Sequence, residues 1–360
     1  MSIITVIGAG QMGSAMAFPA TYNNNTVRLV GSPLDREIIE HGKKTGIHKT
    51  LKKTTPEGTF GFKMPEGVTF HDYEEFDSLL ADTDLLICGV SSFGLDWFCE
   101  TIIPRIPESL PVLSITKGMI HMGDGTMISY PELMEQAAEK CGKKISFNAV
   151  GGPCTSYELA DKDPTEVTFC GHDIEQLRWI RSLLETPYYH ISLSTDVRGV
   201  ECAVALKNAF ALGVTLAVGL SFKREGRELL HYNSQAALFE QATKEMTKIL
   251  AICEGHPSNI YLGIGDLYVT VYGGRTRLIG TLLGQGDTFD EAMAKLKGVT
   301  LESIVIGART AECIRKRIDL GLEKAEDFPL LLHIGDLVNG KTTVDVPWTA
   351  FETEFILENN

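Results

Sequence analysis

One lysine in a strongly apolar segment is well placed in this sequence for proton transfer. Lys207 and Asn208 interrupt the apolar residues 203–220, which predict a buried helix rather than a membrane span. Burial disfavours the charged form of a lysine, so such a side chain can exchange a proton with a hydroxyl or carbonyl oxygen. The alternative is a structural lysine that pairs with a carboxylate such as Glu201. The residues alone leave both interpretations open.

A second polar group stands in the segment Gly263–Arg277. Asp266 and Thr270 are four residues apart, so a helix places them on one face, where Asp266 could pair with Lys207. Two glycines free the backbone before Arg275, whose planar guanidinium is suited to binding a phosphate through two hydrogen bonds. The alternative is an ordinary polar pair on a helix followed by a loop.

The N-terminal residues predict a dinucleotide-binding turn. A β-rich apolar run, Ile3–Ile7, leads into the pattern G-x-G-x-x-G, and residues compatible with a helix follow it. Gly8 permits a tight turn, Gly10 lets the backbone approach a pyrophosphate, and Gly13 lets the helix pack closely on the strand. The N–H groups at the helix N-terminus would bind that pyrophosphate. The alternative is a strand–helix turn that binds nothing.

The residues after the second predicted strand, 26–30, bear on the choice between NAD and NADP. A carboxylate at the strand end would bind the ribose 2′-hydroxyl of NAD, but Gly31 and Ser32 stand there instead. Asp35 follows a few residues later, and Arg36 could face the 2′-phosphate of NADP. The absence of an acidic residue at the strand end therefore permits NADP. A helix cap with solvent-exposed charges explains the same residues equally well.

Two further candidates follow buried strands predicted at residues 110–115 and 145–150. Lys117 comes after the first of these strands, and the carboxyl ends of parallel strands face the ligand site. Its alternative role is that of a surface cation. The turn Gly151-Gly152-Pro153 comes after the second strand, where its backbone N–H groups could bind an anion or its glycines could form a hinge.

Strand-like and helix-like segments alternate over residues 1–150, which predicts a doubly wound parallel sheet. Residues 32–66 are polar and rich in lysine, and we expect an excursion or mobile loop rather than core. We expect a Rossmann domain over residues 1–194 and an all-α domain over residues 195–360, with a cleft between them. The helices expected from the apolar periodicity lie at 196–222, 233–254, 259–272, 287–296, 301–318 and 327–338.

The composition is that of a globular protein with an excess of acidic residues. The 360 residues include 44% hydrophobic and 22% charged residues, and the length favours two domains. A net charge of −14 argues against nucleic acid and anionic membranes as partners. The eight cysteines lack the spacing of a metal site, so we expect no metal and reduced thiols in a cytoplasmic protein. A homodimer fits the helical half, although no segment demonstrates it.

Taken together, these motifs resemble the NAD(P)-dependent glycerol-3-phosphate dehydrogenase family. The motifs that carry the resemblance are G-A-G-x-x-G at Gly8–Gly13, T-K-G at Thr116–Gly118, G-G-P at Gly151–Pro153, A-L-K-N at Ala205–Asn208 and G-x-G-D-L-x-x-T-x-Y-G-G-R at Gly263–Arg275. The last two in combination are specific to this family. The resemblance implies a Rossmann domain followed by a helical domain, and a small phosphorylated substrate. It also implies hydride transfer between NAD(P)H and dihydroxyacetone phosphate, giving sn-glycerol 3-phosphate.

The resemblance also implies roles for individual residues. Lys207 would be the general acid and base, and Lys117 and Asp266 would complete the catalytic set. The cofactor would contact Gly8, Gly10, Gln11, Met12, Gly13, Ser32, Lys117, Ser156 and Arg275. The substrate would contact Lys117, Gly152, Asn208, Asp266, Thr270, Gly274, Arg275 and Thr276.

Three positions depart from the family pattern. Thr276 stands where the family usually has asparagine, and Ile306 stands where it carries a Gln or Glu that reaches the cofactor. The Ser32-Pro33 stretch is also atypical. These departures motivate an alternative, a related dehydrogenase that acts on another polyol phosphate or a hydroxy acid. A non-catalytic regulator that binds NAD(P) is a third hypothesis, which the intact set of Lys207, Asp266 and Arg275 disfavours.

Overall fold

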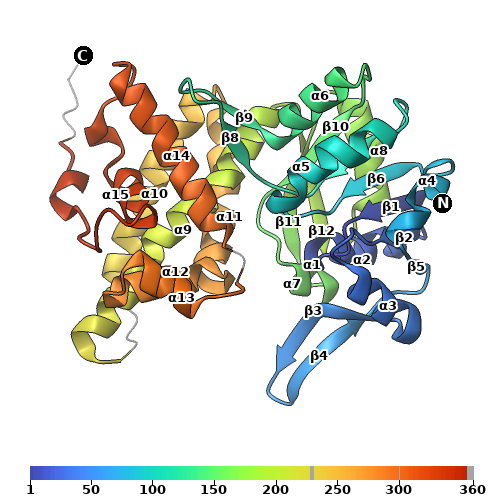
Figure 1. The fold of residues 1–360 in the computed structure, drawn as a ribbon, viewed down its shortest axis with the longest axis horizontal. Helices are drawn as coiled ribbons and strands as arrows, with labels where there is room; N and C mark the ends of the chain where they lie inside the picture. The colour runs from blue at the N-terminus through green and yellow to red at the C-terminus, as the bar shows by residue number, and fades with distance from the viewer. Residues whose placement is uncertain (228–230, 300, 355–360) are drawn as a thin grey trace. The chain divides into compact units, whose positions relative to one another are not determined.

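A computed structural model describes residues 1–227, 231–299 and 301–354, which form two compact units (Figure 1). The first unit comprises Met1–Met119 and Ile128–Val204, and the second comprises Ile120–Met127 and Ala205–Asn360. The chain passes between the units inside helix α9, Val197–Glu225. The domain limit between residues 194 and 195 stays a prediction.

The first unit contains one eight-stranded sheet with the order β12-β11-β10-β7-β6-β1-β2-β5. From β5 to β10 the neighbouring strands are parallel, and their order is the one typical of dinucleotide-binding sheets. The strand β11 runs antiparallel to β10, so the prediction of a parallel sheet holds for this sheet except at that pairing. The strands are β1 (Ile3–Ile7), β2 (Thr26–Val30), β5 (Val68–His71), β6 (Leu85–Cys88), β7 (Val112–Ser114), β10 (Phe147–Gly151), β11 (Thr165–Cys170) and β12 (Tyr189–Ser194).

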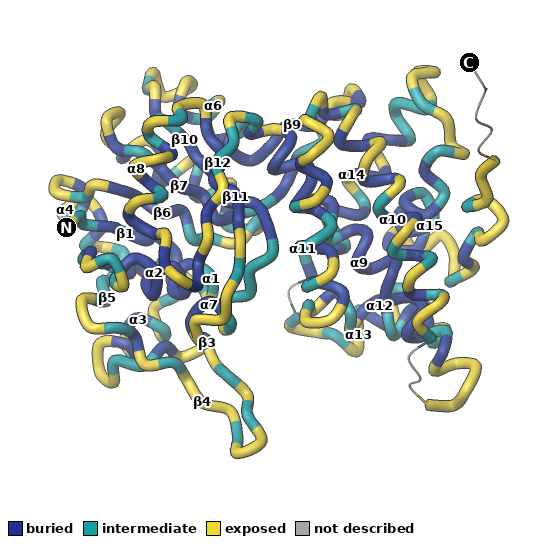
Figure 2. Tube along the Cα trace, turned by 180° about the vertical axis from the view of Figure 1, so that it is seen from behind, coloured by how far each residue is buried: buried dark blue, intermediate teal, exposed yellow. Residues whose placement is uncertain are grey.

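Burial explains why the central strands read as unbroken apolar runs. Every residue of β6, β7 and β10 is buried, and these strands are dark blue in Figure 2. The helices of this unit are α1 (Gln11–Ala15), α2 (Ala17–Tyr22), α3 (Arg36–Thr45), α4 (Phe76–Leu80), α5 (Leu95–Trp97), α6 (Tyr130–Lys140), α7 (Ser156–Ala160) and α8 (Ile174–Leu184). Short 3₁₀ turns cover Tyr73–Glu75, Ser92–Gly94 and Ile103–Arg105, and a π-helical turn covers Phe98–Ile102.

The prediction for residues 32–66 is wrong in excluding core residues, although the stretch does leave the eight-stranded sheet as an excursion. This stretch forms α3 and a hairpin of two strands, β3 (Ile47–Thr55) and β4 (Gly58–Lys63). Ile39 and Leu51 are buried in the core although lysines dominate the sequence around them. A Cβ atom at Gly42 would lie 2.2 Å from the ring of Phe70, so α3 packs directly on β5. The polar residues that suggested a loop form the exposed faces of these elements.

The second unit is helical, as predicted. Its helices, with the part of α9 that belongs to it, are α10 (Tyr232–Ile252), α11 (Ile260–Gly273), α12 (Thr276–Gln285), α13 (Phe289–Lys295), α14 (Glu302–Asp319) and α15 (Pro329–Val338). Three-residue or four-residue 3₁₀ turns lie at Pro257–Asn259, Ala325–Asp327 and Trp348–Phe351.

The helix α12 was missed by the sequence analysis, because two of its residues are glycines that lower helix propensity. In the structure these glycines let α12 approach α9 closely. A Cβ atom at Gly280 would lie 1.9 Å from Oγ1 of Thr215, and one at Gly284 would lie 2.3 Å from the carbonyl oxygen of Leu216. The glycines therefore serve the packing of two helices.

The helix α9 is long and apolar enough to cross a membrane by length and composition alone. However, 83% of its most apolar window is buried inside the protein. This burial agrees with the prediction of a buried helix for residues 203–220.

The hairpin that joins the second unit is formed by β8 (Met119–His121) and β9 (Met127–Ser129). At its tip the carbonyl oxygen of Gly125 accepts hydrogen bonds from the Cys313 thiol and from Nη1 of Arg317, both at 3.3 Å. Both donors lie on α14, so the hairpin is attached to a helix far along the chain.

A buried carboxylate on α10 caps the start of α15. Glu245 is fully buried, and its two oxygens accept hydrogen bonds from the backbone N–H groups of Leu330 and Leu331, each at 2.8 Å. The side chain of Gln241 donates a third bond at 2.7 Å. These hydrogen bonds lower the pKa of Glu245, but burial has the larger effect and raises it to about 7.

We expect this pKa to make the unfolding free energy depend on pH. Between the ordinary carboxyl pKa near 4.5 and the folded value of about 7, the folded state holds a proton that the unfolded state has lost. Stability from this group is therefore complete below pH 4.5 and falls by about 3 kcal/mol as the pH rises through 7. Urea unfolding of the wild type and of Glu245→Gln, from pH 4 to 8, measures this dependence.

The Glu245→Gln variant should lack this part of the slope. The matched control is Glu240→Gln on the same helix, because the Glu240 side chain is exposed and pairs with Lys244. The control should keep the slope of the wild type. An unchanged slope in Glu245→Gln would show that the carboxyl does not titrate in this range.

Candidate active site

Two of the three glycines in the N-terminal turn are required by the packing of the protein itself. Gly8 has a φ of +98°, and a Cβ atom there would lie 2.8 Å from the backbone carbon of Gly89. A Cβ atom at Gly13 would lie 2.6 Å from the carbonyl oxygen of Gly8. The close approach occurs after β1 and β6, where the strand order of the sheet reverses and dinucleotides bind.

Gly10 differs from its two neighbours in the pattern. Its φ of −65° suits any residue, and a Cβ atom there would meet nothing nearer than the carbonyl oxygen of Gly89 at 3.8 Å. The protein's own packing therefore gives no reason for a glycine at this position. The open space over Gly10 fits a ligand whose phosphates approach the backbone, and the first turn of α1 carries no acidic residue that would repel them.

The side chain of Gln11 joins the glycine turn to the β3–β4 hairpin and to α7. Nε2 of Gln11 donates to the carbonyl oxygen of Thr50 at 3.1 Å, and Oγ of Ser156 donates to Oε1 of Gln11 at 3.4 Å. Of the predicted cofactor residues, the structure thus brings Gln11 and Ser156 together. Met12 is half-buried beside Gln11 at the start of α1.

His48, which no sequence motif marks as a site residue, lies against the glycine turn. Its Nδ1 accepts the backbone N–H groups of Leu51 at 2.7 Å and Thr50 at 3.2 Å. Nε2 must then carry the hydrogen, which it donates to the carbonyl oxygen of Ala9 at 3.1 Å. Burial lowers the pKa of His48, which favours this neutral form. One histidine among lysines resembles a surface residue, so the sequence holds little signal for this contact.

Asp35 contacts the glycine turn from the end of β2. Its Oδ2 accepts the backbone N–H of Ala9 at 3.1 Å, the N–H of Ser32 at 2.8 Å and the hydroxyl of Ser32 at 2.7 Å. Although Asp35 is distant from the strand end in sequence, its carboxylate returns to it. Arg36 is exposed, and its Nη2 lies 3.2 Å from Oε1 of Glu74.

Lys117 and Gly152 contact each other in the first unit. Nζ of Lys117 donates to the carbonyl oxygen of Gly152 at 2.7 Å. A Cβ atom at Gly118 would lie 2.2 Å from the ring of Tyr130, so this glycine lets the loop that carries Lys117 pack on α6. Lys117 itself is half-buried.

The helical unit holds the predicted pair of Lys207 and Asp266. Nζ of Lys207 on α9 lies 2.5 Å from Oδ1 of Asp266 on α11. The side chains are 15% and 2% exposed, so the carboxylate is buried while part of the lysine is accessible. The alternative partner Glu201 belongs to the first unit, and its Oε2 accepts a hydrogen bond from the backbone N–H of Gly118 at 3.4 Å.

The other predicted substrate residues of this unit lie on α11, at the start of α12 and beside Lys207. The hydroxyl of Thr270 donates to the carbonyl oxygen of Asp266 at 2.7 Å, which leaves its oxygen able to accept a hydrogen bond. A Cβ atom at Gly274 would lie 2.6 Å from the carbonyl oxygen of Thr270, so a glycine is needed where α11 ends. Arg275 is exposed directly before α12, Thr276 is its buried first residue, and Asn208 is half-buried.

Ile306 is buried on α14, with 4% of its surface exposed. Its carbonyl oxygen accepts the hydroxyl of Thr310 at 2.7 Å, as is common inside helices. The side chain has no polar atom with which to contact a ligand.

Two family models match consecutive parts of this chain. The model of the NAD-dependent glycerol-3-phosphate dehydrogenase N-terminus matches residues 3–176, and the model of its C-terminus matches residues 196–348. The chain belongs to the NAD-dependent glycerol-3-phosphate dehydrogenase family. As a member of this family, the protein is an oxidoreductase that acts on a CH–OH group with NAD or NADP.

Relatives of known name agree with this family. An NADP(+)-dependent glycerol-3-phosphate dehydrogenase of Archaeoglobus fulgidus is 30% identical over 86% of this chain and 88% of its own length. A glycerol-3-phosphate dehydrogenase [NAD(P)+] of Syntrophobacter fumaroxidans is 27% identical over 86% and 84%. The solved glycerol-3-phosphate dehydrogenase of Plasmodium falciparum has the same fold, with a TM-score of 0.80, 20% identity and coverage of 99% and 97%.

Among residues 1–227, 231–299 and 301–354, no three His, Cys, Asp or Glu side chains are placed to hold a metal ion. The eight cysteines are thiols that are not joined in disulfides, and five of them are buried.

The two kinds of glycine in the turn give a matched prediction. Gly10→Ala should leave the unfolding free energy within about 1 kcal/mol of the wild type, because its Cβ atom enters open space. Its affinity for NADH and NADPH should fall tenfold or more, because that space is where the pyrophosphate approaches. Gly8→Ala should lose more than about 1 kcal/mol of stability.

Thermal unfolding and fluorescence titration of the reduced cofactors measure these two effects separately. Normal cofactor affinity in Gly10→Ala would show that the ligand does not approach this backbone.

Proposed function

We propose that this protein interconverts dihydroxyacetone phosphate and sn-glycerol 3-phosphate, with Lys207 as the general acid and base. The observation that carries the proposal is the pair of Lys207 and Asp266, a buried carboxylate beside a partly accessible ammonium group 2.5 Å away. Membership of the glycerol-3-phosphate dehydrogenase family and the names of its relatives support the substrate.

The position of this pair indicates which group transfers the proton. A bound nicotinamide cofactor would supply the hydride for reduction of the ketone carbon and would take it up in the reverse reaction. The ammonium group of Lys207 donates a proton to the ketone oxygen as that oxygen gains negative charge, and recovers it in the reverse direction. The carboxylate of Asp266 accepts a hydrogen bond from Nζ of Lys207 and so fixes the position of the ammonium group.

The surrounding residues are proposed to position the substrate. Arg275 binds the phosphate through its guanidinium group, and Gly274 and Thr276 complete that site at the start of α12. Asn208 and Thr270 contact the hydroxyl groups, and the oxygen of Thr270 acts as an acceptor because its hydrogen is already donated.

The first unit is proposed to contribute to both ligands. Gly8, Gly10, Gln11, Met12 and Gly13 hold the pyrophosphate, and the hydrogen bond from Ser156 to Gln11 supports that turn. Lys117 contacts substrate and cofactor from beside Gly152.

Location and assembly are further proposals. We expect a cytoplasmic protein that neither binds nucleic acid nor inserts into membranes, because its net charge is −14 and its cysteines are not joined in disulfides. We also propose a homodimer formed through the helical unit, which the apparent mass in solution would test.

An alternative substrate is kept because of two observations. Thr276 replaces the asparagine usual in the family, and Ile306 presents a buried apolar side chain where a polar contact to the cofactor would be expected. These changes favour a related dehydrogenase that acts on another polyol phosphate or a hydroxy acid.

Initial rates of NADH and NADPH oxidation with dihydroxyacetone phosphate test the leading function. Turnover with either cofactor would support it. Failure with both, in protein that binds cofactor, would favour the alternative, which a panel of phosphorylated ketoses and keto acids would then examine.

Variants of the central pair separate catalysis from structure. Lys207→Ala should lower kcat about a hundredfold or more, while the affinity for cofactor persists. It should also destabilise the protein by about 3–5 kcal/mol, because Asp266 is left buried without its cation.

The double variant Lys207→Ala with Asp266→Asn removes both charges. It should regain most of the lost stability and none of the lost turnover. Recovery of turnover together with stability would show that Lys207 is structural.

A further inference from the structure

We propose that the guanidinium of Arg36 recognises the group at the 2′ position of the cofactor. Glu74 weakens this recognition, because its carboxylate competes for the same guanidinium. The proposal rests on the proposed function only in assuming that a dinucleotide binds at the N-terminal turn. It deepens that function, because it names the residues by which this chain distinguishes NADPH from NADH.

A pocket lies where the sheet geometry places the adenosine ribose. Its volume is about 160 Å³, and it is open at the carboxyl ends of β2 and β5, two neighbouring strands. Ser32 and Arg36 line it on the side of β2, and Asp72 and Glu74 line it on the side of β5. In sheets of this order the ribose is bound at the end of the second strand, where an arginine can accommodate a 2′-phosphate.

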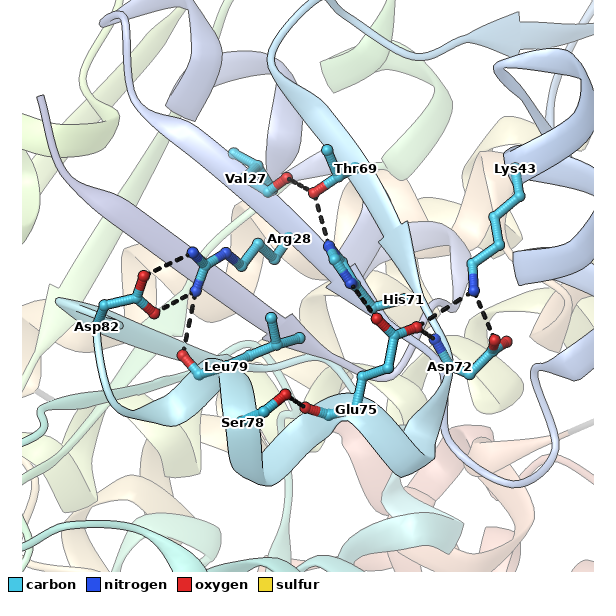
Figure 3. Close-up of polar contacts among 10 residues, drawn as sticks. All are labelled: Val27, Arg28, Lys43, Thr69, His71, Asp72, Glu75, Ser78, Leu79 and Asp82. Atoms are coloured by element: carbon cyan, nitrogen blue, oxygen red, sulfur yellow. Dashed lines mark hydrogen bonds and ion pairs between the residues drawn. The ribbon is translucent and has the colours of Figure 1, made fainter.

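The carboxylates around this pocket have different partners. Asp72 lies 2.5 Å from Nζ of Lys43, which also contacts Glu75 at 3.3 Å (Figure 3). Oε2 of Glu75 also forms a hydrogen bond with Nδ1 of His71 at 3.0 Å. These contacts lower the pKa of Glu75 to about 2. Both carboxylates are therefore engaged by Lys43, and Glu75 also by His71.

Asp35 is also committed to the protein. One oxygen of its carboxylate accepts three hydrogen bonds, from Ala9 and from the N–H and hydroxyl of Ser32. These bonds hold the turn after β2 in place, so Asp35 shapes the pocket. The cation that can move to meet a 2′-phosphate is Arg36.

Glu74 holds Arg36 weakly in the absence of such a phosphate. Nη2 of Arg36 lies 3.2 Å from Oε1 of Glu74, and the two side chains are 70% and 66% exposed. Exposed ion pairs contribute little to stability, so Arg36 can exchange Glu74 for a phosphate at small cost. A phosphate offers two oxygens to the planar guanidinium, whereas a 2′-hydroxyl gains little from a cation.

Fluorescence titrations of NADPH and NADH test the assignment without turnover. Arg36→Gln should raise the Kd for NADPH tenfold or more and leave the Kd for NADH within twofold. Glu74→Gln should lower the Kd for NADPH about threefold and leave that for NADH unchanged. Displacement by adenosine 2′,5′-bisphosphate, compared with adenosine 5′-monophosphate, should show the same two effects on the adenosine end alone.

Arg178→Gln is the matched control, because Arg178 and its partner Glu175 form an exposed ion pair on α8 that does not line this pocket. It should alter neither Kd. An Arg36→Gln variant that binds NADPH and NADH like the wild type, or weakens both equally, would overturn the proposal.

The outcome for the proposed function is separate. Wild-type turnover of dihydroxyacetone phosphate combined with an unselective Arg36→Gln would remove this inference alone. A selective Arg36→Gln in a protein that does not turn over that substrate would remove the substrate assignment alone.

Discussion

The buried ion pair of Lys207 and Asp266 imposes the strictest requirement on the helical unit. A carboxylate that is 2% exposed must keep its cation close, so α9 and α11 cannot shift relative to each other without a large energetic penalty. The glycines of α12 extend the same rigidity, because Gly280 and Gly284 bring that helix against the backbone of α9. Arg275, directly before α12, is thereby held relative to Lys207 by packing.

The features that sequence analysis predicted well are those encoded locally. The turn from Gly8 to Gly13 follows from residue types at fixed spacing after a strand, and the structure places it at the expected reversal of strand order. The pairing of Lys207 with Asp266 was one of two open alternatives. A buried lysine requires a partner, but the sequence alone does not identify which residue that partner is. The resemblance to a known family assigned the individual roles.

The features that the sequence did not reveal depend on contacts between distant segments. Residues 32–66 appeared too polar for core because their buried side, including Ile39, Leu51 and His48, is narrow. The role of His48 depends on its contact with Ala9, and the role of Asp35 depends on the hydrogen bond between its carboxylate and Ser32. Neither contact can be inferred from the sequence around these residues. The helix α12 was hidden because its glycines serve close packing against α9, which propensity does not report.

The hairpin from Met119 to Ser129 has a consequence for the order in which the protein can be completed during synthesis. Its tip, Gly125, is bonded to Cys313 and Arg317, which lie 188 and 192 residues further along the chain. The ribosome therefore finishes the strands of the first unit while this hairpin still lacks the helix that receives it. A fragment that ends before α14 would contain the hairpin without the two donors that bind Gly125. A fragment that begins at α10 would contain those donors without the hairpin.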